Sequence, residues 1–300
     1  MKKILVPTDF SPEANKALDV AVQIAKQAKA EIILIHACDL LNTTFKDNQA
    51  IYKEYNQAII DKANKRLSFS KKSVEDPDIS VNIKLYNGNI TNTILQASEE
   101  HQADIIIMGS LSEARLKEKI FGCKTADIIG RTNIPVLAVP LLEWAIPEKI
   151  LMTVNNFEEQ PDITNLVFEL AVLFNATVHI IMFNEADPDK HIDYLERKKT
   201  VSAYIEKLKA TYKSTDIKHT YLYGQTFQET IEEFIHEQGI DIVAMVTHKR
   251  TFMESIFNRS MTKKMFYNTQ IPLLIIPAVN KKSSFKKTIE NENKYSNAWI

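Results

Sequence analysis

The sequence predicts an α/β fold made of two tandem copies of one domain, each an open parallel sheet with helices on both faces. Short apolar strands alternate with helical segments along the chain, the pattern of right-handed βαβ units around a parallel sheet. The order also repeats. Residues 241–245 match residues 104–108 at an offset of 137, and residues 271–277 match residues 134–140 at the same offset. A duplicated domain accounts for this self-similarity.

The bulk composition is that of an ordinary globular protein, with 45% hydrophobic and 25% charged residues among 300. The formal net charge is −1 and no long basic run occurs, so nucleic acid is not an expected partner. Cys38 and Cys123 form neither a CxxC pair nor a metal-binding pattern, which favours a reduced, cytoplasmic setting. The apolar stretch before Pro7 is too short for a signal peptide, and no run approaches the roughly 18 apolar residues of a membrane span. A membrane partner is therefore not expected either.

The first domain is expected to cover residues 1–141 and to begin with a strand at 4–6. Ser11 and Pro12 have the chemistry of a helix N-cap and first helical position, and small apolar residues then mark one helix face as far as Ala28. The remaining strands are expected at 31–37, 79–86, 104–108 and 135–140. The remaining helices are expected at about 47–71, at 90–100 and from Gly122 onward. The helix at 47–71 is polar, with apolar Ile51, Tyr55, Ala58, Ile59 and Leu67.

A brief linker at 141–148 leads to the second domain, expected at 148–278. Its strands are predicted at 149–154, 177–183, 216–223, 241–246 and 271–277. Its helices are predicted at 161–174, 190–212, 226–238 and about 259–268. Residues 279–300 are polar and rich in Lys and Asn, which indicates a frayed C-terminal tail.

The polar loop at 110–121 is the first candidate site, because two of the six glycines in the chain, Gly109 and Gly122, bracket it. Glycine permits backbone angles and close approaches that other residues resist. A loop between a strand and a helix N-terminus collects backbone N–H groups that can hold an anion. The loop is therefore a candidate phosphate site. It is not a P-loop, because Cys123 separates Gly122 from Lys124 and Lys117 stands where the earlier glycine would be.

These motifs, in this order and present twice, resemble the universal stress protein family over nearly all of residues 1–278. Residues 3–11 resemble the family's first strand and acidic turn, and residues 35–37 resemble the end of its second strand. Residues 108–125 lie where the family carries its nucleotide motif, and residues 134–140 resemble its closing strand. The glycine motif consists of Gly, two residues, Gly, nine residues, Gly, then Ser or Thr.

The resemblance implies five parallel strands in each domain, in the Rossmann-like arrangement of the adenine nucleotide alpha hydrolases. It also implies binding of ATP, with Mg²⁺ accompanying it, or of AMP. The acidic turn and the end of the second strand would hold adenine and ribose, and the loop would hold phosphate. The implied contact residues in the first domain are Pro7, Thr8, Asp9, Ala37, Met108, Gly109, Ser112, Gly122, Cys123, Lys124 and Thr125.

The first copy departs from the motif at two positions. Ser112 replaces the middle glycine, which would cost about 1–2 kcal/mol if a left-handed backbone is required there. Cys123 replaces the final Ser or Thr, and its S–H is a weaker donor than a hydroxyl. Thr125, two residues on, is a candidate substitute. Two interpretations stay open for this loop: an ATP or AMP site, and a relic that merely packs.

The second copy departs further and is expected to be degenerate. Asn155 takes the place of Asp9, Val246 that of Gly109, and Lys249 that of Ser112. Arg259 and Ser260 take the places of Gly122 and Cys123. Lys249 and Arg259 either reach into the vacated pocket or are solvated side chains.

The favoured function is regulatory binding of adenine nucleotide in the first domain, with slow hydrolysis or none, since no general base stands out beside the loop. The alternatives are a nucleotide-free interaction module that acts through its surfaces, and a true ATP hydrolase. His36 is interpreted as structural or pocket-lining. Cys123 is interpreted as buried and inert, with redox sensing as the alternative. The two domains are expected to form an internal pseudo-dimer through strands 136–139 and 273–276, and a homodimer of the chain is left open.

Overall fold

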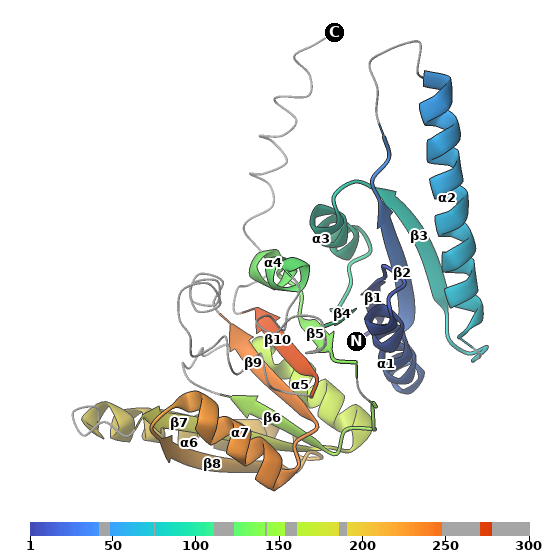
Figure 1. Cartoon of the computed structure of the whole chain (residues 1–300). Helices are drawn as coiled ribbons and strands as arrows, with labels where there is room; N and C mark the ends of the chain where they lie inside the picture. Colours follow the sequence, from blue (N-terminus) through green and yellow to red (C-terminus); the bar gives the residue numbers. More distant parts are fainter. Residues whose placement is uncertain are drawn as a thin grey trace.

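The structure is a computed structural model, and its described residues are 1–41, 49–74, 76–110, 123–141, 143–153, 161–185, 191–247 and 271–277. Within them the chain forms two halves of the same order (Figure 1). The strands of the first half are β1 Lys3–Pro7, β2 Glu31–Cys38, β3 Val81–Asn87, β4 Ile105–Gly109 and β5 Val136–Val139. Its helices are α1 Pro12–Ala28, α2 Gln49–Lys72, α3 Ile90–Glu100 and α4 Cys123–Arg131.

The second half repeats this series. Its strands are β6 Lys149–Thr153, β7 Thr177–Glu185, β8 Ile217–Gly224, β9 Ile242–Thr247 and β10 Leu273–Pro277. Its described helices are α5 Pro161–Phe174, α6 His191–Thr211 and α7 Phe227–Gln238. The predicted strands and helices agree with these elements to within two residues at nearly every end, and the α/β class is confirmed. The helix predicted at about 259–268 and the tail at 279–300 lie outside the described residues.

Local chemistry sets the helix ends. The Ser11 side chain accepts the N–H of Ala14, and Pro12 is the first residue of α1, as the sequence predicts. Asn89 caps α3 and Thr226 caps α7 in the same way. At the other end of α7, Gly239 adopts the left-handed conformation with φ 60° and donates its N–H to Ile235.

The ten strands form one sheet in the order β3-β2-β1-β4-β5-β10-β9-β6-β7-β8. Every neighbouring pair is parallel except β5 and β10, which are antiparallel. There Leu273 pairs with Ala138, Leu274 with Leu137, and Ile275 with Val136. Figure 1 shows this pair in the middle of the sheet, where it joins the two halves. The prediction that these two strands pair is confirmed.

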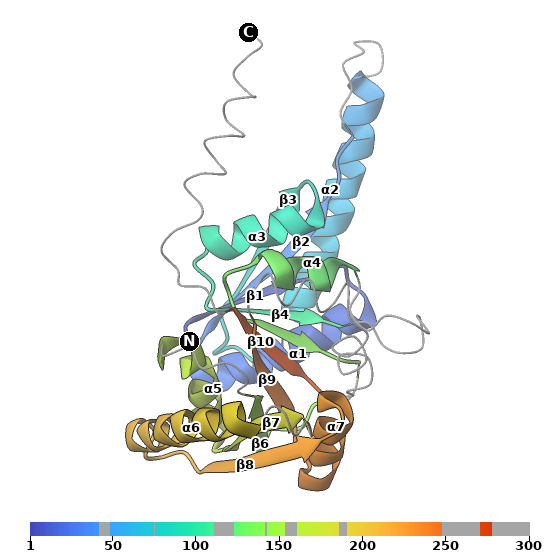
Figure 2. The same ribbon diagram turned by 90° about the vertical axis from the view of Figure 1, so that its left-hand side faces the viewer.

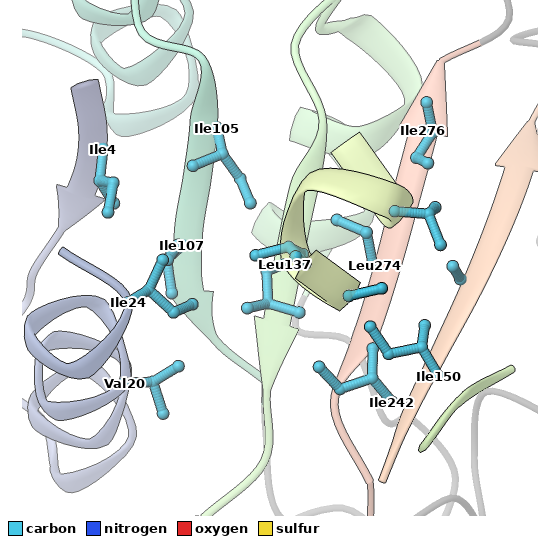
Figure 3. Close-up of a cluster of buried hydrophobic side chains, with 14 of the residues drawn as sticks. Ile4, Val20, Ile24, Ile105, Ile107, Leu137, Ile150, Ile242, Leu274 and Ile276 are labelled. Atoms are coloured by element: carbon cyan, nitrogen blue, oxygen red, sulfur yellow. The ribbon is translucent and has the colours of Figure 1, made fainter. Parts of the chain in front are cut away.

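The side chains alternate between the two faces of the sheet, as expected for strands covered on both sides. Ile4 and Val6 belong to one core with α1, α2, α5 and α6, whereas Leu5 belongs to a second core with α3, α4 and α7. The first core runs without interruption across β5 and β10, where Leu137 lies beside Leu274 (Figure 3). The two halves therefore share their hydrophobic core.

Two helices of the first half differ in how much they are covered. α1 lies against the middle of the sheet, and α2 stands at its outer edge next to β3 and extends past the strands in both views (Figures 1 and 2). Across the described part of the chain, no helix combines the length and the apolar character that crossing a membrane requires.

Candidate functional site

The order of the strands reverses between β1 and β4. The chain passes from β1 to β2 on one side and later returns to place β4 on the other side, with Ile4 opposite Ile105 and Leu5 opposite Ile106. The carboxyl ends of these strands, Pro7 and Gly109, consequently lie at the same edge of the sheet. Ligands of open α/β sheets bind outside such a reversal. The sequence predicted that the strands ending near Asp9 and Gly109 flank this crevice, and the topology places them there.

The turn after β1 holds Asp9 at the mouth of the crevice through backbone hydrogen bonds. The Thr8 N–H donates to the carbonyl of Ile35 over 2.8 Å, which attaches the turn to β2. The Thr8 Oγ1 accepts the N–H of Phe10 over 2.9 Å, and the Asp9 Oδ1 accepts the N–H of Ser11 over 3.0 Å. Thr8 is buried, whereas Asp9 is exposed. The turn therefore presents a carboxylate to solvent on a fixed backbone.

His36 anchors the same turn from β2. Its Nδ1 lies 2.7 Å from the carbonyl oxygen of Thr8 and donates to it. Its ring stands 4.5 Å from the ring of Phe10, centroid to centroid, and the Arg66 guanidinium of α2 lies 4.2 Å from the centroid of the same Phe10 ring. Phe10 itself has φ 63°, in the left-handed region that side chains rarely adopt. The predicted structural role of His36 is thus seen directly, and Ala37 follows it, paired with Tyr86 of β3.

Sequence reasoning missed Phe10 and Arg66. Phe10 is one residue of a predicted turn, with no local signal for a positive φ. Arg66 is one of several basic residues on a polar helix, and only the packing of α2 brings it over Phe10. Neither contact could be found without the tertiary arrangement.

On the β4 side, Gly109 is required by close packing. A Cβ atom at this position would lie 2.6 Å from the backbone carbonyl atoms of Glu13, in the first turn of α1. The glycines with positive φ among the described residues are Gly88 and Gly239, and Gly109 is not one of them. The next amide is also committed, since the Ser110 N–H donates to the carbonyl of Val139 over 2.8 Å. Donors for a phosphate must therefore come from later in the loop or from α4.

The loop itself and the start of α4 complete the predicted site. Ser112 and Gly122 lie outside the described residues, and α4 begins at Cys123, one residue after the predicted start. Cys123 and Lys124 belong to the helix backbone, and their side chains are not described. Thr125 is buried in the first turn, at 4% exposure. The structure thus brings Thr8, Asp9, Met108 and Gly109 to one edge and leaves the loop contacts as predictions.

The second half has the same reversal between β6 and β9. Val246 lies near the end of β9, at the position that corresponds to Gly109. The other altered positions, Asn155, Lys249, Arg259 and Ser260, lie outside the described residues, so the degenerate second site stays a prediction. Among the described residues, no group of three or more His, Cys, Asp and Glu side chains could hold a metal ion.

The two reversals define the chain as a tandem, doubly wound α/β protein of the kind that places ligands at the carboxyl ends of its strands. The model of the universal stress protein family matches residues 1–140 and 147–277. The chain therefore belongs to the universal stress protein family, as a member with two tandem domains. The bounds predicted from the sequence, 1–141 and 148–278, stay predictions.

Individual relatives agree with this assignment. The universal stress protein MJ0577 of Methanocaldococcus jannaschii is 33% identical over 153 residues, which cover 46% of this chain and 94% of the relative. The universal stress protein YxiE of Bacillus subtilis is 27% identical over 144 residues, 46% of this chain and 97% of the relative. A crystal structure of a universal stress protein from Archaeoglobus fulgidus superimposes with a TM-score of 0.66, covering 91% of this chain and 97% of that chain. Its sequence identity is 16%, so this last likeness shows the fold alone.

Proposed function

We propose that the first half binds ATP or AMP in the crevice between β1 and β4, and that this binding regulates a stress response. The observation that carries the proposal is the reversal of strand order between β1 and β4, with the Thr8–Asp9 turn at one lip and the Gly109–Ser110 turn at the other. Open α/β sheets bind nucleotides at this place. Membership in the universal stress protein family supports the same ligand class.

The chemistry of the two lips suits the two ends of a nucleotide. Asp9 is an exposed carboxylate on a backbone fixed by three hydrogen bonds, and a carboxylate accepts readily from ribose hydroxyls. The β2 backbone at Ala37 is close by, since Thr8 and His36 are hydrogen-bonded to each other across β1 and β2. The free N–H groups at the N-terminus of α4 favour an anion. Because the Ser110 amide is engaged, we assign the phosphate contacts to residues 112 and 122–125.

The second half is proposed to lack a nucleotide site, and its Val246, Lys249 and Arg259 are the reason. Hydrolysis is proposed to be slow or absent, so the nucleotide, with Mg²⁺ when it is ATP, acts as a regulatory ligand. A cytoplasmic setting belongs to the same proposal and rests on the isolated cysteines. The alternative is a nucleotide-free interaction module that acts through its surfaces, which the exposed face of α2 favours.

Calorimetric titration of the full chain with ATP and AMP tests the proposal. The native protein should bind saturably, and Gly122→Arg should abolish binding by filling the loop. Asp9→Asn introduces the residue of the second half and keeps the oxygen that accepts from Ser11. A lost charge-assisted hydrogen bond of about 1.5–3 kcal/mol makes binding at least about tenfold weaker. Asp127→Asn, an exposed carboxylate on α4, is the control and should leave affinity unchanged.

Two results would overturn parts of this proposal. No heat of binding at millimolar ATP or AMP would exclude the nucleotide site and leave the interaction module. Phosphate release from ATP well above background, lost in Gly122→Arg, would show that the first half is an enzyme.

A further inference from the structure

Helix α2 carries two stripes of side chains, and only one of them faces the sheet. The inner stripe includes Ala63, Leu67 and Ser70, which are all buried. The outer stripe is displaced around the helix and consists of positions alternately four and three residues apart, from 51 to 72. That spacing keeps every member of the outer stripe on one side of the helix and is the spacing at which two helices pack along a seam.

The outer stripe is apolar at four of its seven positions although it faces solvent. Ile51 is 67% exposed, Tyr55 is 53% exposed and Phe69 is 74% exposed. Ala58 lies between them and is exposed too. These are three of the eight large hydrophobic side chains that the described residues expose, and they fall on one line of one helix. Exposed apolar side chains that gather in this way mark an interaction surface.

The other three positions of the stripe are Lys62, Lys65 and Lys72. α2 contains six basic and two acidic side chains, a net charge of +4, whereas the whole chain carries −1. From residue 62 to residue 72 the helix has five basic residues and no acidic one. No ion pair joins these three lysines to another described residue. The stripe therefore offers apolar contact and uncompensated positive charge along one seam.

The surface around Phe69 is also shaped. Hollows of about 500 and 540 Å³ lie on its two sides, and Lys65 and Phe69 line both of them. The first hollow lies along α2, and the second reaches Phe10 and Leu18 between α2 and α1. Such relief accommodates protruding side chains.

The second half provides an internal comparison, because α6 occupies the place of α2. Its buried residues Val201, Ile205 and Leu208 have the same spacing as Ala63, Leu67 and Ser70. The positions that then correspond to the outer stripe from Lys62 onward are Thr200, Ala203, Lys207 and Ala210. No large apolar side chain is exposed there. The stripe is thus not a consequence of the fold but a property of α2.

We propose that the outer stripe of α2 docks an amphipathic helix of a partner protein that carries acidic side chains opposite Lys62, Lys65 and Lys72. Apolar side chains of that helix contact Ile51, Tyr55 and Phe69, which serve as anchors at helical spacing. The carboxylates pair with the lysines and set the register. This surface is independent of the nucleotide crevice.

Charge and shape select this occupant. A second copy of the chain would bring another α2 with a charge of +4 against the first, and like charges across an interface are unfavourable. A membrane would require a flat, continuous apolar face, whereas Glu54 and Asp61 flank this narrow stripe and hollows interrupt it. A nucleic acid strand would use stacking platforms at successive nucleotides, and here a single aromatic ring stands among the lysines.

Photo-crosslinking from the full chain tests the proposal. A benzophenone amino acid replaces Phe69, and the matched control places it at Lys207 on α6; the protein is expressed in the cells that make it. The expected product at position 69 is a protein adduct whose crosslinked segment is an acidic amphipathic helix. The triple variant K62E/K65E/K72E should abolish it, and K199E/K207E/K213E should not. All six lysines are exposed, and circular dichroism of each variant checks that the fold is kept.

The crosslinked segment, made as a synthetic peptide, then provides an affinity. Its Kd for the native chain should weaken at least tenfold in K62E/K65E/K72E and stay within twofold in K199E/K207E/K213E. An adduct with a second copy of the chain, with lipid or with nucleic acid would overturn the proposal. An adduct with a segment that is not an acidic helix, or no adduct above that of position 207, would overturn it as well.

Discussion

A Cβ atom on Gly109 would lie 2.6 Å from the carbonyl carbon of Glu13, so the end of β4 touches the first turn of α1 backbone to backbone. This contact lies directly beside the crevice, and it accounts for the glycine without any ligand. The contact also brings α1, whose N-terminus follows the Asp9 turn, against the opposite lip. The geometry of the crevice therefore depends on the absence of a side chain at position 109.

Replacing Gly109 with Ala should destabilise the protein by about 1–3 kcal/mol, because the added methyl group meets backbone rather than a movable side chain. Urea unfolding followed by circular dichroism measures this change. Gly130→Ala is the matched control. Gly130 lies within α4 and does not have a positive φ, so alanine there should leave stability unchanged or raise it by up to about 1 kcal/mol. Equal stability of Gly109→Ala and the native chain would contradict the close contact.

The Arg66–Phe10 contact should be measurable as a coupling energy. The guanidinium lies 4.2 Å from the ring centroid and is exposed, where such interactions contribute about 0.5–1 kcal/mol. A double-mutant cycle of Arg66→Ala and Phe10→Leu should give that coupling in the free energy of unfolding. The control cycle pairs Phe10→Leu with Lys62→Ala, a basic residue one turn earlier on α2, and should give no coupling. Additive effects of Arg66→Ala and Phe10→Leu would show that the two side chains do not interact.

The elements of the fold were predictable because their signals are local. Ser11 and Pro12 indicate the start of α1, and runs such as residues 104–108 indicate buried strands. The duplication added long-range information, since the matching strands 136–139 and 273–276 predicted the pair that joins the two halves. The site was predictable only where it follows directly from strand ends, as at Thr8 and Asp9.

The remaining features depend on contacts between distant segments. Nothing in the sequence near Gly109 shows that Glu13 approaches it, and the motif suggested a ligand instead. On α2 the apolar residues Ile51, Tyr55 and Leu67 form one set in the sequence. The structure divides them, because Leu67 is buried against the sheet while Ile51 and Tyr55 face outward. Which side of a helix is covered is decided by its packing, and a polar helix with two weak stripes does not reveal it.

A charge placed between the halves should disrupt both of them. Leu274 is fully buried, pairs with Leu137 across the antiparallel junction and belongs to the core that the halves share. Leu274→Asp buries a carboxylate without a partner and should lower the free energy of unfolding by more than about 3 kcal/mol. Ile146→Asp, at a position 58% exposed, should change it by less than about 0.5 kcal/mol.

The same variants test whether the halves unfold together. Because the core is continuous, fluorescence of Trp144 and circular dichroism should report one transition in the native chain. Two well-separated transitions would show that the junction of β5 and β10 does not couple the halves.

The last prediction concerns His179, which is buried in β7 with its Nε2 lacking a hydrogen-bond partner among the described residues. Its ring packs edge-on against Phe234 of α7 at 6.2 Å. Burial lowers the pKa of His179 below its usual 6.5, and the charges of Lys218 and Lys149 lower it further, against a smaller opposite effect of Asp216. His179 is therefore neutral in the folded protein near pH 7.

The sign of the pH dependence follows from this shift. Below pH 6.5 the unfolded chain takes up a proton that the folded chain does not, so the free energy of unfolding falls as the pH falls from 6.5 toward the lower folded pKa. His179→Leu should flatten the dependence in that range, measured by urea unfolding between pH 7.5 and 5. His236→Gln, at an exposed position on α7, should retain the native slope. A native slope in His179→Leu would show that other groups cause the loss of stability in acid.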